Sequence, residues 1–174
     1  LKKLVMAALF AALACVAYDV NQDSYSRNKW IYSPGDAIVI LAGVVLGPAW
    51  GFLAGGIGSA MADLLGGYFV YVPITFVIKG LVSLCSALLY RKVGKNSKSR
   101  YTAVILGGVA DIILVAGGYC LCEYFIYGAG AFASVPANLV QGIGGLILLL
   151  YLSDFDCNSG CKTDSTCEFI SFVY

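Results

Sequence analysis

The sequence predicts an all-α membrane protein, a bundle of six transmembrane helices with both termini on the cytoplasmic side. Of its 174 residues, 60% are hydrophobic and 12% are charged, whereas a soluble domain averages roughly 45–50% apolar and about 25% charged residues. So few charges cannot cover a surface that faces water. The apolar residues also fall into separate runs, and the length suits one domain of about six short spans.

Three of the predicted helices lie in the first half of the chain, over residues 4–18, 36–46 and 49–65. A Ser-Pro-Gly-Asp cluster precedes the second run, which is typical of a helix start that places Asp36 in the first turn. Gly47 and Pro48 separate the second run from the third. Because both runs are shorter than the roughly 20 residues of a lone span, a re-entrant hairpin is the alternative to two crossings.

The other three predicted helices cover residues 74–90, 101–127 and 135–152. An aromatic connector over residues 66–73 leads into the first of them, and residues 128–134 are expected to form a loop. The run 101–127 is long enough to cross a bilayer with some tilt.

Basic residues indicate the orientation. Lys2 and Lys3 precede the first run, and the connector 91–100 carries five basic residues and no acidic one. The positive-inside rule places both segments in the cytoplasm. Four crossings then separate them, so the connectors 19–35, 66–73 and 128–134 face outside.

Residues 1–152 are expected to form one transmembrane domain, followed by an atypical tail over residues 153–174. The tail carries Cys157, Cys161 and Cys167 without a clear fourth ligand to close a zinc site, so no metal is expected. The chain begins at Leu1, and we expect residues before it. A signal-peptide core over residues 4–18 is the alternative to a first helix.

Polar side chains at membrane depth are costly and by default mark function. With the predicted orientation, several of them collect near the outer ends of the runs, below aromatic connectors. Asn138 and Gln141 are three residues apart and share one helix face. The arrangement predicts a pocket that opens outward, with aromatic walls and a few hydrogen-bonding groups. The candidate substrate-binding residues are Tyr68, Tyr71, Thr75, Lys79, Glu123, Asn138 and Gln141.

Each of these groups also has a structural interpretation. Asp63 and Lys79 could form an ion pair between two helices, and Glu123 could be a solvated helix end. The two amides of the sixth run could join helices, and the tyrosines could be an interfacial belt. Asp111 lies deeper and apart from the others, where a structural hydrogen bond or a contact to a Lys or Arg is favoured.

A stripe of small residues marks the first run. Ala7, Ala8, Ala11 and Ala12 form two overlapping Ala-x-x-x-Ala pairs, which make a flat face for close helix packing. That face suits docking against a partner subunit, and internal packing is the alternative.

Motifs of soluble enzymes are missing from the sequence. It contains no histidine and no Walker loop, so a Ser-His-Asp triad is excluded and no enzymatic activity or cofactor is expected. The net charge of +1 gives no reason to expect nucleic acid as a partner. A self-sufficient small transporter or channel is the alternative to a binding subunit. It would need a continuous charged path, whereas the inner halves of the runs are almost free of charge apart from Asp111.

Four stretches resemble the substrate-binding S components of energy-coupling factor (ECF) transporters. They are residues 35–37 (GDA), 46–51 (LGPAWG), 58–80 and 135–142 (VPANLVQG). The resemblance covers about residues 4–152 and is greatest to the riboflavin, pyridoxine and hydroxymethylpyrimidine types. The polar first outer loop and the cysteine-bearing tail depart from the pattern of the family, and the loop leaves the vitamin open.

The resemblance implies a multi-pass protein of the bacterial plasma membrane that binds and takes up a small water-soluble vitamin or precursor. The family's helix-six Asn falls on Asn138 and its helix-four Lys on Lys79. The first outer loop, the 66–73 connector and the last three helices would build the site. The alanine face would dock onto a transmembrane scaffold subunit that carries two ATPase subunits, and import would follow from toppling of the S component.

Overall fold

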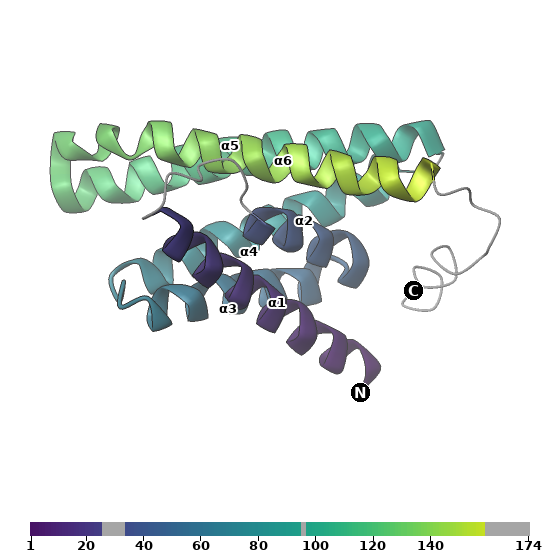
Figure 1. The fold of residues 1–174 in the computed structure, drawn as a ribbon, viewed down its shortest axis with the longest axis horizontal. Helices are drawn as coiled ribbons and strands as arrows, with labels where there is room; N and C mark the ends of the chain where they lie inside the picture. The colour runs from purple at the N-terminus through teal and green to yellow at the C-terminus, as the bar shows by residue number, and fades with distance from the viewer. Residues whose placement is uncertain (26–33, 95–96, 159–174) are drawn as a thin grey trace.

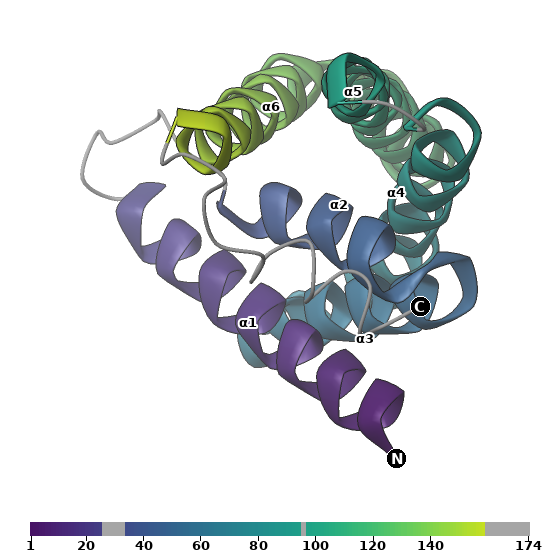
Figure 2. The same ribbon diagram turned by 90° about the vertical axis from the view of Figure 1, so that its right-hand side faces the viewer.

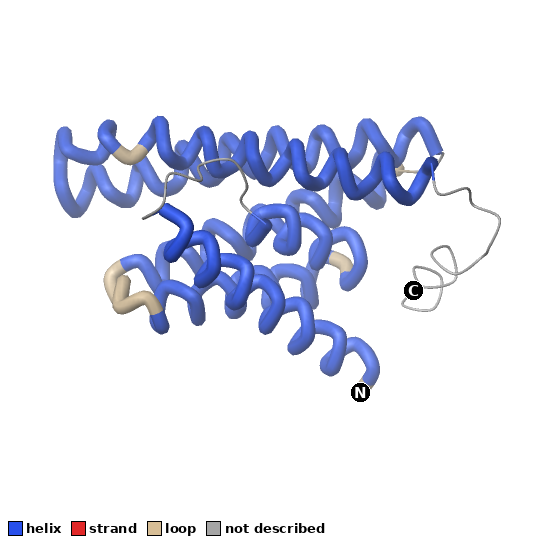
Figure 3. The backbone as a smooth tube through the Cα atoms, in the orientation of Figure 1, coloured by secondary structure: helices blue, strands red, loops and turns tan. Residues whose placement is uncertain are grey.

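The computed structural model describes residues 1–25, 34–94 and 97–158, and within these ranges the chain is helical and contains no strand (Figure 3). The predicted all-α class and its six helices are confirmed. The elements are α1 (Lys2–Tyr25), α2 (Pro34–Leu46), α3 (Pro48–Leu65), α4 (Tyr71–Val93), α5 (Ser97–Tyr127), the 3-10 helix η1 (Gly128–Ala133) and α6 (Val135–Asn158).

Helix α2 lies at the centre of the bundle. It contacts each of the other five α-helices, and Figure 2 shows it between α1 and α3 on one side and the α5–α6 pair on the other. Helices α5 and α6 run side by side and extend beyond the α1–α4 group at the end where η1 joins them (Figure 1). Most of α2 is buried, including Val39, Ile40 and Ala42. This short helix is therefore the core around which the longer helices pack.

Glycines allow α2, α3 and α4 to approach closely. A β-carbon placed on Gly43 would lie 2.1 Å from the carbonyl oxygen of Ser83, and one on Gly51 would lie 2.7 Å from Cα of Gly43. Neither position has room for a larger residue. Gly47 adopts a φ of 83°, which lets the chain turn directly from α2 into α3.

The outer surface carries large apolar side chains, whereas ionisable groups are buried. Val16, Ile57, Val77 and Ile113 are each about half exposed or more, on four different helices. A soluble protein shows the opposite distribution. Two segments, Tyr71–Val93 and Thr102–Ala133, are long and apolar enough to span a bilayer. These features are those of a membrane protein.

Several predicted boundaries shift. Residues 128–133 form a 3-10 helix where a loop was expected. Helix α4 begins at Tyr71 and not after Pro73, because proline is tolerated in the first turn, where its missing N–H is not needed. Helix α1 continues to Tyr25, and α6 continues six residues past the expected domain boundary at 152. Most of the first outer loop (26–33) and of the tail (159–174) lies outside the described residues.

Candidate functional site

Helices α4 and α5 meet along a line of paired polar side chains, which we call the α4–α5 seam. Its members are Tyr71, Thr75 and Lys79 of α4 and Asp111, Tyr119 and Glu123 of α5. Residues four apart share one face of a helix, so α4 presents its three groups in a row. Helix α5 runs in the opposite direction and presents its own row at spacings of eight and four.

The pairs follow one another along the two helices. The Tyr71 hydroxyl donates to Oε1 of Glu123 over 3.0 Å. One helical turn further, the Thr75 hydroxyl lies 2.7 Å from the Tyr119 hydroxyl. After another turn, Nζ of Lys79 lies 4.0 Å from Oδ1 of Asp111.

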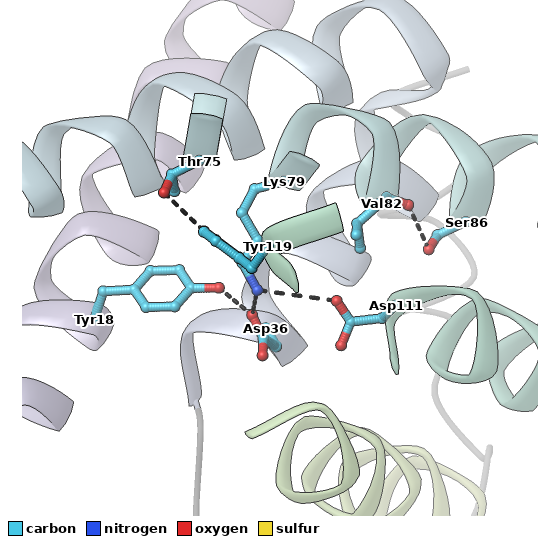
Figure 4. A network of polar contacts seen from close by, with 8 residues as sticks. All are labelled: Tyr18, Asp36, Thr75, Lys79, Val82, Ser86, Asp111 and Tyr119. Atoms are coloured by element: carbon cyan, nitrogen blue, oxygen red, sulfur yellow. Dashed lines mark hydrogen bonds and ion pairs between the residues drawn. The ribbon is translucent and has the colours of Figure 1, made fainter. Parts of the chain in front are cut away.

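Lys79 is the centre of a buried charge network (Figure 4). Its ammonium donates to and forms an ion pair with Asp36 of α2, which also accepts from the Tyr18 hydroxyl of α1. Lys79 is 1% exposed, and Asp36 and Asp111 are 0% exposed. Four helices thus contribute to one polar cluster inside an apolar bundle. Such a cluster is costly unless its charges are paired, so it is a candidate for function.

The other end of the seam is aromatic. Buried Glu123 accepts from Ser134 as well as from Tyr71. The Tyr71 ring lies between two others, with centroids 6.5 Å from Tyr68 in an edge-to-face arrangement and 6.5 Å from Tyr119. Tyr68 is 52% exposed, so it forms the accessible rim of this end.

Two carboxyl groups keep unused acceptor atoms. The Thr75 hydroxyl interacts with Asp63, in the last turn of α3. Oδ2 of Asp63 and both carboxyl oxygens of Asp111 are buried without a hydrogen-bond donor among the described residues.

The structure brings together four of the seven predicted binding residues, Tyr71, Thr75, Lys79 and Glu123, and places Tyr68 beside them. Asn138 and Gln141 are half-buried in the first turns of α6, a helix that packs on α5 and α2. Neither amide hydrogen-bonds a described residue of the seam.

The alternative of an ion pair between Asp63 and Lys79 is not found, because the ion-pair partners of Lys79 among the described residues are Asp36 and Asp111. Asp111 therefore does not lie apart from the cluster, although the favoured contact to a basic side chain is confirmed. The reason is that Asp36, at the start of the central helix α2, holds the ammonium on the side of α4 that faces α5.

Sequence reasoning missed Tyr18, Asp36 and Tyr119. A usable signal for Tyr119 was present, because it lies four residues before Glu123 and eight after Asp111, on the same face of α5. The sequence presents Asp36 as the acidic residue of a helix start and as part of the stretch 35–37, and neither observation indicates a contact with Lys79.

A family model described as "ECF-type riboflavin transporter, S component" matches residues 1–155. The chain belongs to this family. The family is one of transporter components and not of enzymes, and its name supports riboflavin, whereas nothing specific supports pyridoxine. ECF S components bind vitamins and work with scaffold and ATPase subunits.

A curated protein from Pyrococcus woesei, described as an uncharacterized protein in a gap 3′ region, resembles this S component. It is 37% identical over 117 residues, which are 66% of this chain and 74% of that protein. No solved structure matches the chain.

The alanine stripe of this S component divides into two halves. Ala7 is buried, and Ala11 packs on α3, where a β-carbon on Gly58 would lie 2.5 Å from the Ala11 carbonyl oxygen. Ala8 and Ala12 are exposed. Ala7 and Ala11 therefore pack against the rest of the chain, whereas Ala8 and Ala12 lie on its outer surface.

Proposed function

We propose that this S component binds riboflavin at the aromatic end of the α4–α5 seam and delivers it to an ECF importer. The observation that carries the proposal is the match of residues 1–155 to riboflavin S components. The seam supports it, because buried polar groups and tyrosine rings are what a flat, polar heterocycle requires.

The chemistry of riboflavin suits the groups at this end. Its three-ring system offers a large flat face, and the centroid of the Tyr71 ring lies 6.5 Å from that of Tyr68 and 6.5 Å from that of Tyr119. Its ring carbonyls, ring N–H and hydroxylated side chain need both donors and acceptors. Asn138 and Gln141, at the start of α6, supply both kinds of group.

Import requires partners that the chain itself does not provide. We propose six membrane crossings with both termini in the cytoplasm, in a plasma membrane, and docking to a transmembrane scaffold that carries two ATPases. Ala8 and Ala12 would form the docking face, because small exposed residues one turn apart let a partner helix approach closely. The basic residues of the 91–100 connector support the orientation.

Binding is tested on the purified protein. Flavin absorbance and a mass spectrum of the released small molecule should identify riboflavin, and a fluorescence titration should give saturable binding. Asn138→Ala should weaken binding roughly ten- to a hundredfold, since losing a buried hydrogen-bond partner costs about 1–3 kcal/mol. Asn158→Ala, at the opposite end of α6, is the matched control. No saturable flavin binding to the wild-type protein would contradict the proposal.

Docking is tested with two alanines of the same stripe. Ala8→Trp should abolish uptake in cells that express the complete importer and leave riboflavin binding to the isolated protein unchanged. Ala11→Trp should also lower the stability of the isolated protein, because Ala11 packs on α3. Normal uptake by Ala8→Trp would show that the exposed half of the stripe is not the docking face.

A further inference from the structure

Tyr18 of α1 lies outside the α4–α5 seam but contacts its charged centre in two ways (Figure 4). Its hydroxyl donates to Oδ1 of Asp36, the same oxygen that accepts from the ammonium of Lys79. Its ring lies beside that ammonium, with the ring centroid 5.3 Å from Nζ. At this distance the face of an aromatic ring attracts an ammonium. One side chain of α1 thus holds both members of the buried ion pair.

The residue before Asp36 leaves the space that the Tyr18 ring occupies. A β-carbon on Gly35 would lie 2.6 Å from two carbons of that ring, so a larger residue at the start of α2 would displace it. Gly35 and Asp36 belong to the stretch 35–37 that resembles ECF S components. The structure gives the two residues one local role, because the glycine admits the ring and the aspartate accepts its hydroxyl.

The ammonium of Lys79 lies between two carboxyl groups that hold it unequally. It donates to Asp36, whereas Oδ1 of Asp111 is 4.0 Å away, which is too far for a hydrogen bond. Charges attract one another strongly in a low-dielectric interior, so Asp111 would draw an ammonium that is released from Asp36. The two contacts of Tyr18 oppose that movement, since the hydroxyl holds the carboxylate and the ring holds the ammonium.

The position of the ammonium also concerns the next pair along the seam. Asp111 shares a face of α5 with Tyr119, whose hydroxyl lies 2.7 Å from the hydroxyl of Thr75 on α4. A shift of the ammonium toward Asp111 would change how α5 sits against α4 at this level, and with it the geometry of the neighbouring pair.

Resting on the proposed riboflavin binding, we propose that Tyr18 is a positioning residue for Lys79. It keeps the ammonium at Asp36 and thereby keeps the seam in the geometry that binds the vitamin, and Gly35 provides the space in which it does so. The affinity for the vitamin therefore depends on a side chain of α1, a helix that contributes no residue to the seam.

The first experiment is a fluorescence titration of the purified protein with riboflavin. Tyr18→Phe keeps the ring but removes the hydroxyl that donates to Asp36, and should weaken binding at least about threefold, as expected for residues of one hydrogen-bond network. Gly35→Ala displaces the ring without removing a polar group and should weaken binding by a similar factor. Tyr151→Phe, the same chemical change at a tyrosine of α6 that is 69% exposed, is the control and should bind like the wild-type protein.

The second experiment separates positioning from a role in folding alone. Asp111→Asn removes the carboxylate charge that competes for the ammonium. In this background Tyr18→Phe should weaken riboflavin binding by less than about twofold, because the ammonium then has no second carboxylate to approach. A hydroxyl that served only to stabilise the fold would give the same loss of affinity in both backgrounds. Denaturant unfolding of each variant measures its stability separately.

Two results overturn the inference. One is an affinity for riboflavin that is unchanged in both Tyr18→Phe and Gly35→Ala, and the other is an equal loss in Tyr18→Phe with and without Asp111→Asn. In either case the wild-type protein still binds riboflavin, and the proposed function stands. A wild-type protein that does not bind riboflavin contradicts the proposed function and, with it, this inference.

Discussion

Two helix interfaces of this protein are held together in opposite ways. The α4–α5 interface pairs polar groups turn by turn, as in the bonds from Tyr71 to Glu123 and between Thr75 and Tyr119. The α1–α3 interface uses small residues, with the backbone of Ala11 directly above Gly58. In a bilayer, lipid is as apolar as the helices, so the hydrophobic effect does not drive their association. Close backbone packing and hydrogen bonding are the two means that remain.

The comparison distinguishes an interface that only holds helices together from one that also carries groups able to bind a ligand. The α1–α3 contact is apolar and offers a ligand nothing to recognise. The seam carries buried groups whose hydrogen bonding is incomplete, since neither carboxyl oxygen of Asp111 accepts a hydrogen bond from a described residue. Apolar residues at these positions could stabilise the α4–α5 interface as well as the polar residues do. The excess of polar groups therefore supports our proposal that the ligand binds at the seam and not at the tighter interface.

Removing the charge at the centre of the seam should have the largest effect. Lys79→Met leaves Asp36 and Asp111 buried without a counter-charge and should lower the free energy of unfolding by about 3–5 kcal/mol. The measurement is denaturant unfolding of the purified protein in detergent. Lys92→Met, exposed in the last turn of the same helix, is the control. Wild-type stability of Lys79→Met would show that the ion pair does not hold α2, α4 and α5 together.

Crowding the α1–α3 interface should have the next largest effect. Gly58→Ala places a β-carbon 2.5 Å from the Ala11 carbonyl oxygen, and overpacking of this kind costs about 1–3 kcal/mol. Gly117→Ala on α5 is the matched control, because its β-carbon would meet nothing within 4 Å. This variant should have the stability of the wild-type protein or be slightly more stable. The same unfolding assay applies. Equal stabilities of the two variants would mean that α1 and α3 are not in close contact.

Deleting one hydrogen bond of the seam should have the smallest effect. Tyr71→Phe keeps the ring but removes the hydroxyl that donates to Glu123. This change should lower the free energy of unfolding by about 0.5–1.5 kcal/mol. Tyr68→Phe is the control, because the Tyr68 ring packs edge to face on Tyr71 and is half exposed. If Tyr68→Phe lowers the free energy of unfolding more than Tyr71→Phe does, the Tyr68 hydroxyl contributes more to stability than the bond from Tyr71 to Glu123.

The sequence predicts the helices well, because apolar runs and Gly-Pro breaks are local features. Side-chain partners are less predictable. Asp36 stands in the first turn of a helix, where an acid is already explained by the helix dipole, so nothing in the sequence indicates that it holds Lys79. The position of Asp111 along the chain indicates its depth in the membrane. It does not indicate which face of α5 is turned toward α4.

The alanine stripe shows the same limit. Spacing identifies a flat face on α1, but it does not determine which edge faces α3. The structure turns Ala7 and Ala11 inward and leaves Ala8 and Ala12 exposed, because Gly58 of α3 admits the backbone at Ala11. The sequence therefore locates the alanine stripe but does not indicate which of its alanines are buried and which are exposed.

The hydrogen bond from Tyr18 to Asp36 joins the far end of α1 to the charge network of Lys79. The contact of Ala11 and Ala14 with Gly58 lies between that end and the exposed Ala8, and Tyr18 is about 10 Å from Ala11 at 1.5 Å per residue. One continuous helix therefore carries the proposed docking residue, the closest contact with α3 and a ligand of the buried carboxylate of Asp36.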